Sequence, residues 1–322
     1  MSRGPCRPPV PGVAALSKNL PASVRQRLTD KAKETDRPFQ EVLQYFAMER
    51  FLYRLARSRH AHRFVLKGAL LFTAWGGPSS RTTKDIDFLA RMDNDVEAVV
   101  AVIREVCTQE VEPDGLAFDA GSGEGEAIKE DADYSGVRVK FLVTLQNARV
   151  SMQIDMGFGD VVTPAATLTE YPALLGFPAP QLLGYPRETV VAEKFEAMTK
   201  LGLLNSRMKD FYDLWVLRRQ FDFDGGTLAT AIRRTFAHRK TAVVARPTAL
   251  TAAFGEDAAK QTQWQGFLRK TRLDDVPPSL QSVIDELAPF LVPVAAAVET
   301  RSAFEWFWTA PGPWRTNRSA DS

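Results

Sequence analysis

The sequence predicts an α/β unit followed by an all-helical half. Polar and apolar residues alternate, as in a strand with one buried face, at Asp85–Ala90, Val137–Leu145 and Arg149–Met156. Apolar residues recur at helical intervals of three and four before these segments and from Arg187 onward. The shares of hydrophobic residues (45%) and charged residues (25%) exclude a disordered, coiled-coil or collagen-like chain.

The first part of the chain mixes helices and strands. Three segments have the helical period: Pro21–Arg59, Ala69–Trp75 and Asp95–Cys107. Arg63–Leu66 is a short strand-like approach to Lys67, and the turn Gln146–Ala148 joins the two later strands into a hairpin. We expect an exposed loop at the acidic, glycine-rich segment Asp119–Asp133 and a connector at Val161–Pro186.

From Arg187 onward the sequence predicts helices only. They are Arg187–Leu201, Met208–Gln220, Gly226–Ala237, Asp257–Lys270 and Leu280–Val298. Both ends of the chain are rich in Pro, Gly, Ser and Arg and are expected to be flexible. The predicted organisation is a tail over 1–15, a helical lead-in and core over 16–186, a helical domain over 187–308 and a tail over 309–322.

Composition and charge exclude several classes of protein. The 41 basic and 39 acidic residues give a net charge of +2, so any contact with nucleic acid must come from a local arrangement of basic residues. The apolar stretch Leu287–Val298 is shorter than the roughly 20 residues that span a bilayer. Cys6 and Cys107 make neither a disulfide framework nor a zinc site, and we expect a reducing, cytoplasmic location.

Three aspartates on predicted strands are candidate metal ligands. Asp85 and Asp87 are two apart, so both side chains project from the same face of their strand. Two such carboxylates repel each other unless a cation lies between them, and Mg²⁺ or Mn²⁺ suits oxygen ligands. Asp155 ends the second hairpin strand and would complete a site for two metal ions. The alternatives are surface acids on an edge strand and, for Asp155, a turn residue.

Two basic segments are candidate phosphate ligands. Lys67-Gly68-Ala69 joins a strand to a helix, where a glycine allows phosphate to approach the backbone, although the same pattern also serves ordinary turns. Later, Glu193-Lys194 and Arg207 accompany Asp210 and Asp213, which share a helix face. Lys194 and Arg207 would bind a triphosphate, whereas the alternative is an amphipathic helix with exposed acids and salt bridges.

The ordered set of motifs resembles the AbiEii/AbiGii family of nucleotidyltransferase toxins, including the MenT-type enzymes. The resemblance runs from about Arg63 to Leu217 and rests on FVLKGALL at Phe64–Leu71, RTTKDIDF at Arg81–Phe88, QIDMG at Gln153–Gly157, Glu193-Lys194 and KDFYDL at Lys209–Leu214. It implies a polymerase β-type core with a helical C-terminal domain. It also implies Mg²⁺-dependent transfer of a nucleotide from an NTP to the 3′ end of tRNA, a block of translation, a role in phage defence and a cognate antitoxin of the AbiEi or another type.

The resemblance assigns roles to individual residues. Catalysis falls to Asp85, Asp87, Asp155, Lys194 and Asp210, and the first three also hold the metal. Nucleotide binding falls to Lys67, Gly68, Ala69, Thr83, Lys84, Glu193, Lys194, Arg207 and Asp213. Ala69 departs from the Gly or Ser that usually follows the glycine, which affects nucleotide affinity or choice. Thr83 occupies a place where some relatives carry a serine subject to regulatory phosphorylation.

Two basic tracts without acids favour an RNA acceptor. The first contains Arg50, Arg54, Arg57, Arg59, Arg63 and Lys67, and the second contains Arg233, Arg234, Arg239, Lys240 and Arg246. Solvated helix faces are the alternative, and His60, His62 and His238 beside the tracts are interpreted as surface residues. Phe304–Trp308 either docks onto the core or stacks on unpaired bases.

The predicted function is therefore a metal-dependent nucleotidyltransferase with an NTP, a tRNA end and an antitoxin as partners, and without a membrane. Two alternatives remain open. One is an inactive module that binds nucleotide or RNA in the same pocket. The other is transfer to a hydroxyl group of a protein or a small molecule.

Overall fold

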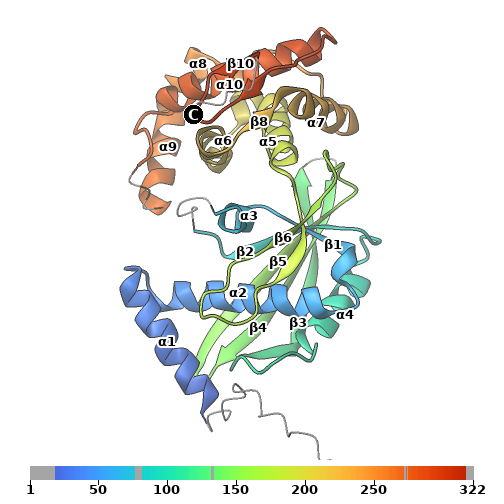
Figure 1. The fold of residues 1–322 in the computed structure, drawn as a ribbon, viewed down its shortest axis with the longest axis vertical. Coiled ribbons are helices and arrows are strands. Elements are labelled where there is room, and N and C mark those ends of the chain that lie inside the picture. The colour runs from blue at the N-terminus through green and yellow to red at the C-terminus, as the bar shows by residue number, and fades with distance from the viewer. Residues whose placement is uncertain (1–18, 77–81, 132–133, 272, 274, 317–322) are drawn as a thin grey trace, which may run out of the picture.

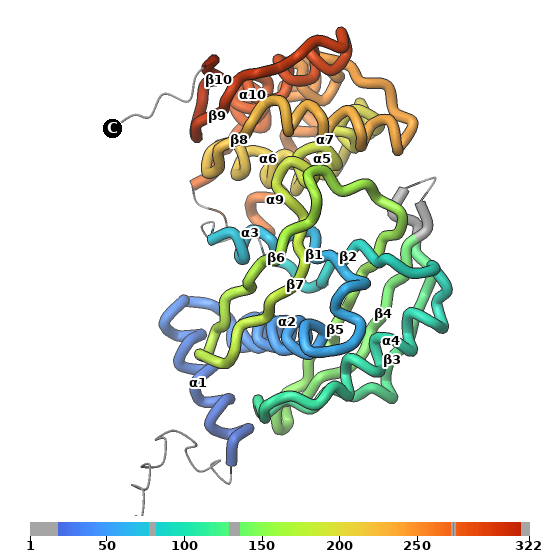
Figure 2. Tube along the Cα trace, turned by 45° about the vertical axis from the view of Figure 1, so that its right-hand side comes forward, coloured from blue at the N-terminus to red at the C-terminus, as the bar shows by residue number. Residues whose placement is uncertain are grey.

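The chain folds into a half built on a β-sheet and a helical half that lies beyond one end of that sheet (Figure 1). The structure is a computed structural model that describes residues 19–76, 82–131, 134–271, 273 and 275–316. The turned view in Figure 2 shows the same division, with the helices from α5 onward gathered together. Both halves contribute to one continuous cluster of buried apolar residues.

The sheet has seven strands in the order β3-β4-β5-β2-β1-β7-β6. Their bounds are Phe64–Lys67 (β1), Asp85–Ala90 (β2), Ala117–Asp131 (β3), Tyr134–Leu145 (β4), Ala148–Phe158 (β5), Thr167–Glu170 (β6) and Gln181–Gly184 (β7). The sheet is mixed, because β2 runs parallel to β5 and β1 parallel to β7 while the other pairs are antiparallel. The predicted hairpin is confirmed as β4 and β5.

Alternation along the central strands gives the sheet an apolar and a polar face. Ile86 and Ile154 are fully buried, whereas Asp85 and Asp87 lie on the opposite side of β2. The helices α2 (Phe39–Arg57) and α4 (Val96–Cys107) pack against the sheet, with α2 on β5 and β7 and α4 on β3 and β4. The long α1 (Leu20–Glu34) packs on α2, and the short α3 (Leu70–Ala74) follows β1.

The helical half begins after Pro186, which supplies the preset backbone angle that suits a helix start. Its helices are α5 (Arg187–Leu201), α6 (Met208–Gln220), α7 (Gly225–His238), α8 (Ala252–Gly255), α9 (Ala258–Thr271) and α10 (Leu280–Glu299). Three short 3-10 turns complete the helical elements of the described chain, at Ala61–Arg63, Gly202–Leu204 and Thr248–Leu250. The predicted bounds of α5 and α6 are confirmed, and those of the other long helices differ by one residue at one or both ends.

Helix α10 has the length and composition of a membrane span, with a mean hydropathy of 1.4 over its most apolar window. Half of that window is buried inside the protein, and α10 packs on α6, α7 and α8. Ten of its residues are buried, among them Leu287, Phe290 and Leu291. Its hydropathy is therefore that of a core helix.

Three predictions about secondary structure are wrong. The segment expected to be a loop at Asp119–Asp133 belongs, up to Asp131, to the long edge strand β3, which pairs with β4 despite its acidic and glycine-rich composition. The expected connector Val161–Pro186 contains β6 and β7. The C-terminal half is not purely helical, because β8 (Phe223–Asp224), β9 (Phe307–Trp308) and β10 (Trp314–Arg315) form a small sheet.

The C-terminal aromatic segment docks onto the core. Trp308 and Trp314 are buried and surround the ring of Phe290 on α10. Trp314 belongs to the predicted tail 309–322, so that tail is ordered at least to β10. The predicted tail 1–15 and Cys6 lie outside the described residues.

Burial removes two arginines of the first basic tract from the surface. Arg54 pairs with Asp114, and Arg50 lies against Glu49 and donates to the carbonyl of Pro178. Both arginines are buried because α2 faces the core along most of its length. His60, interpreted as a surface residue, is also buried and contacts Glu105.

Candidate active site

Three carboxylates meet on the polar face of the sheet at neighbouring strands β2 and β5. The parallel register places Asp87 beside Asp155, and Asp85 lies two residues before Asp87 on the same face. One oxygen from each of Asp85, Asp87 and Asp155 lies within 4.8 Å of the others. The structure thus brings together three residues predicted as metal ligands, two of which are 68 or more positions from the third.

The three negative charges disfavour one another. Burial is the main cause that raises the pKa of Asp87 from 3.8 to about 6; the neighbouring Asp85 and Asp155 act in the same direction, and Lys67 and Lys209 act against it. Burial and like charge both disfavour the charged form of Asp87, and a cation among the carboxylates would offset both effects. Hard oxygen ligands at this separation fit Mg²⁺ or Mn²⁺.

Neighbouring side chains fix the orientation of two of these aspartates. Arg138 on β4 lies opposite Asp155 and donates to both carboxylate oxygens, at 2.8 and 2.7 Å. This bidentate bond raises the pKa of Arg138. Thr83 donates its hydroxyl to Asp85, and its backbone N–H donates to the hydroxyl of Tyr45 at 3.1 Å. The hydroxyl that the family resemblance connects with phosphorylation is therefore buried beside Asp85, a candidate metal ligand.

The backbone at Gly68 passes directly over Asp87. Gly68 has a φ of +75°, and a Cβ atom at this position would collide with the Asp87 carboxylate. Lys67, the preceding residue, pairs in register with Asp87 across β1 and β2. Ala69 is buried at the start of α3, so its side chain belongs to the core. A glycine at position 68 is thus required by both conformation and space.

An ion cluster joins α5 to α6. The Lys194 ammonium lies 2.7 Å from Asp210 and 2.8 Å from Asp213, and Arg207 lies 2.8 Å from the other oxygen of Asp210. Both aspartates are buried, which excludes the alternative of exposed acids on an amphipathic helix. Burial alone would raise the pKa of Asp210, but Lys194 and Arg207 outweigh it and the pKa lies below its ordinary value.

A second ion cluster joins the sheet to α5 and α7. Asp160, just after β5, lies 3.3 Å from Lys67 and 3.0 Å from Arg239. Arg239 also contacts Glu196 at 3.1 Å and Glu193 at 3.6 Å. Burial would raise the pKa of Asp160, yet the two cations hold it below the ordinary value. The cluster therefore holds the end of α7 against α5 and the end of β5 through ion pairs.

A cavity of about 800 Å³ opens between the two halves and contains these groups. Nine predicted site residues line it: Lys67, Gly68, Asp85, Asp87, Asp155, Glu193, Lys194, Arg207 and Asp210. Four others lie outside that lining in the described structure, namely Ala69, Thr83, Lys84 and Asp213. Thr83 and Asp213 support lining residues, whereas Lys84 is exposed beside β2.

Five titratable residues of the cavity were not among the predicted site residues: Arg138, Asp160, Tyr185, Lys209 and Arg239. Arg138 could have been found from the sequence, because the short turn between Leu145 and Ala148 fixes the register of the hairpin and places Arg138 opposite Asp155. Lys209 is the first residue of the KDFYDL motif. It is exposed, lines the cavity and forms no ion pair within the described residues. Asp160 and Arg239 are 79 positions apart, and only the fold pairs them.

The cavity thus offers an acidic site for a divalent ion bordered by cations suited to a polyphosphate. Comparison with protein families gives the decisive observation, since residues 50–286 match the model described as "Nucleotidyl transferase AbiEii toxin, Type IV TA system". The chain belongs to the AbiEii family of nucleotidyltransferase toxins. The cavity and its three aspartates lie inside the matched residues, so this AbiEii protein carries them in the part that defines its family.

Two solved structures resemble the protein at low sequence identity. One is a candidate nucleotidyltransferase from Helicobacter pylori, with 15% identity, a TM-score of 0.40 and coverage of 81% of this chain and 96% of that one. The other is JHP933 from Helicobacter pylori, with 15% identity, a TM-score of 0.40 and coverage of 78% and 89%. No curated protein matches the chain.

Proposed function

We propose that this AbiEii protein transfers a nucleoside monophosphate from an NTP to the 3′ end of tRNA, with Mg²⁺ or Mn²⁺ as cofactor, and thereby blocks translation. The observation that carries the proposal is the triad of Asp85, Asp87 and Asp155 in a cavity that is lined by basic side chains. Phosphoryl transfer requires little covalent chemistry from the protein, so positioning and electrostatic stabilisation account for most of the catalysis.

Each part of the cavity has a proposed role. Asp85, Asp87 and Asp155 would hold the metal, which when bound supplies Lewis-acid stabilisation of the developing charge on the α-phosphate. The backbone at Gly68 and the cations Lys67 and Lys209 would face the triphosphate. Lys194 and Arg207 line the same cavity but are held by Asp210, so we propose that they position α6 as well as contact phosphate.

The family membership supports a toxin with a cognate antitoxin. We propose that the antitoxin limits the reaction in the cytoplasm, where NTPs, Mg²⁺ and tRNA are all present. The buried thiol of Cys107 requires no oxidising environment, and burial raises its pKa to about 12 so that it remains a thiol.

Label transfer from each of the four α-³²P-labelled NTPs to total tRNA tests the proposal. The wild-type protein should label 3′ ends with at least one NTP, and Asp87→Asn should lower the rate at least ~100-fold because one metal ligand is lost. Asp36→Asn is a matched control, since Asp36 is exposed in the turn between α1 and α2 and its positive φ suits Asn.

The proposal fails if Asp87→Asn labels RNA as fast as the wild-type protein. It also fails if the wild-type protein binds NTP and metal but labels no RNA with any of the four nucleotides. Transfer of label to a protein or a small molecule under the same conditions would identify the other acceptor class.

A further inference from the structure

A second cavity, of about 580 Å³, lies beside the catalytic cavity at the carboxyl ends of β2 and β5. Asp160 belongs to the lining of both cavities. Leu89 of β2 lines the second cavity, two residues after Asp87 and on the same face of the strand. At about 3.3 Å per residue in a strand, that separation is about 7 Å. A flexible chain leaving the catalytic cavity would therefore meet the second cavity at once.

The walls of this second cavity combine an apolar surface with two arginines. Ala90, Val162 and Leu183 contribute to the apolar part. Arg91 follows β2 and Arg234 lies on α7; both are exposed, and neither side chain forms an ion pair or hydrogen bond with any residue that the structure describes. Its shared acid, Asp160, is already paired with Lys67 and Arg239. The second cavity therefore presents positive charge without a neutralising partner.

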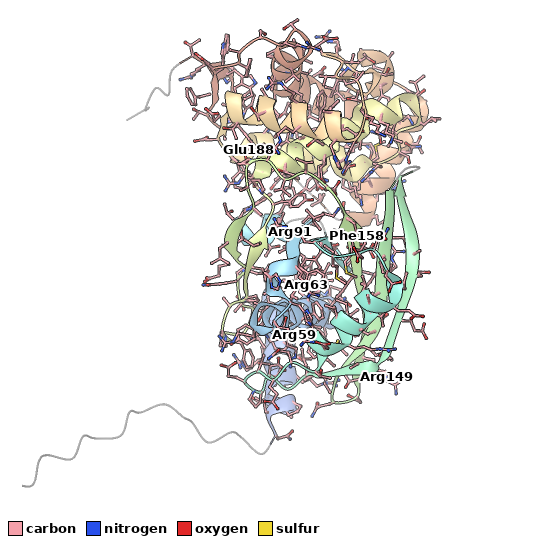
Figure 3. All side chains as sticks on the ribbon, turned by 90° about the vertical axis from the view of Figure 1, so that its right-hand side faces the viewer. Arg59, Arg63, Arg91, Arg149, Phe158 and Glu188 are labelled. Carbon is pink, nitrogen blue, oxygen red and sulfur yellow. The ribbon has the colours of Figure 1, made fainter. Side chains whose placement is uncertain are left out.

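A third arginine extends this charge along the flank of the molecule. Arg63 is half-buried, its carbonyl accepts a hydrogen bond of 2.8 Å from the backbone N–H of Arg91, and its side chain forms no ion pair in the described part of the chain. Figure 3 shows Arg91, Arg63 and Arg59 one below another on the same side of the molecule, with Phe158 beside Arg91. Arg59 is paired with Glu105 at 2.7 Å. We call Arg63, Arg91 and Arg234 the arginine track.

We propose that the second cavity and the arginine track bind the backbone of the RNA strand whose 3′ end enters the catalytic cavity, an inference that rests on the proposed function. Unpaired arginines in and beside one cavity attract successive phosphates, and the apolar wall next to them accepts a base without reading its sequence. A free nucleotide would fill one cavity only, whereas the track continues outside it to Arg63. The buried Arg50 and Arg54 of the first basic tract have no part in it.

RNA binding by a triple variant, R63Q/R91Q/R234Q, tests this assignment. The probe is a 5′-fluorescein RNA hairpin with a four-nucleotide single-stranded 3′ overhang, measured by fluorescence anisotropy without NTP. The Kd should rise at least tenfold, and the salt dependence of log K should weaken by about 2, at about 0.7 per phosphate contact on a single strand. Affinity for Mg²⁺–NTP should stay within twofold of the wild-type value, because no residue of the track lines the catalytic cavity.

A second triple variant, K33Q/R149Q/R301Q, removes the same charge at exposed positions outside both cavities. Figure 3 shows Arg149 well below Phe158, at the other end of β5. RNA affinity of this control should change less than twofold. Equal loss of affinity in both variants would overturn the inference, because net charge alone would then explain it.

Unchanged RNA affinity in R63Q/R91Q/R234Q, with a wild-type melting temperature, would also overturn the inference. If that variant bound RNA normally but lost affinity for poly-L-glutamate, the track would instead be a surface for an acidic protein. In both cases label transfer to RNA by the wild-type protein would leave the proposed function intact. Absence of any transfer to RNA by the wild-type protein would refute the proposed function itself.

Discussion

Gly68 is the residue at which backbone conformation and chemistry depend most directly on each other. Its positive φ lets β1 turn into α3, and the missing side chain leaves room for the carboxylate of Asp87. A methyl group there would displace the carboxylate of Asp87, a proposed metal ligand. Small displacements of reacting groups reduce rates severely, because the barrier depends on their alignment.

We therefore expect Gly68→Ala to lower the rate of label transfer about 100-fold or more. Gly76→Ala is a matched control: Gly76 has a φ of +70°, close to that of Gly68, but among the described residues no atom other than those of its chain neighbours lies within 4 Å of the position of an added Cβ. Both variants carry the same backbone strain, so only the collision with Asp87 differs. Equal rates in the two variants would show that this collision has no consequence.

Asp87 also links the metal site to stability. Its pKa of about 6 exceeds the ordinary 3.8, so the folded protein holds this proton more tightly than the unfolded chain does. The free energy of unfolding of the metal-free protein therefore falls as pH rises from 4 to 7 through this group. A divalent ion between the carboxylates should reverse that loss.

In EDTA at pH 7.5, Asp87→Asn should raise the free energy of unfolding by on the order of 1 kcal/mol, after allowance for solvent screening. At pH 4 the gain should disappear, because the wild-type carboxyl is then protonated. Urea titrations at the two pH values measure the difference. A variant less stable than the wild-type protein at pH 7.5 without metal would contradict this account of the site.

At the scale of elements, the Lys194 cluster connects α5 with α6. The ammonium of Lys194 compensates two buried aspartates on α6, and removing one partner of a buried ion pair leaves the other charge without compensation. The same helices carry the half of the cavity that faces Asp85, Asp87 and Asp155. Loss of this link would affect folding as well as phosphate binding.

Lys194→Met should accordingly lower the free energy of unfolding by about 3 kcal/mol. Lys33→Met, at an exposed position on α1, should change it by less than about 0.5 kcal/mol. Thermal and urea denaturation of the two variants provide the comparison. A Lys194→Met protein as stable as the wild-type protein, yet unable to bind NTP, would instead assign Lys194 to phosphate binding alone.

The elements that the sequence predicted well have strong local patterns. The hairpin β4–β5 alternates regularly and is confirmed as a hairpin, although both strands are longer than predicted. Helices α5 and α6 have a clear helical period, and their bounds are confirmed. Strand β3 was missed because glycines and acids along an edge strand have the composition of a loop. The strand is held by its pairing with β4, and this pairing cannot be predicted from the local sequence of β3 alone.

At the scale of the whole molecule, the cavity exists because the sheet and the helical half meet. The three proposed metal ligands come from β2 and β5, and the groups opposite them come from α5, α6 and the end of α7. Sequence spacing predicted which carboxylates belong together, since strands set them on one face. It could not predict that Asp160 pairs with Arg239, or that Arg50 is buried, because those contacts depend on packing between distant segments.

In the proposed reaction the 3′ hydroxyl of the RNA attacks the α-phosphate of an NTP, and pyrophosphate leaves. Incubation of the protein, Mg²⁺ and total tRNA with α-³²P-labelled or γ-³²P-labelled NTP in parallel tests it most directly. The account predicts label at the RNA 3′ end from the α-phosphate alone, and no transfer after EDTA is added. Transfer of the γ-phosphate, or transfer from the α-phosphate that persists in EDTA, would contradict it.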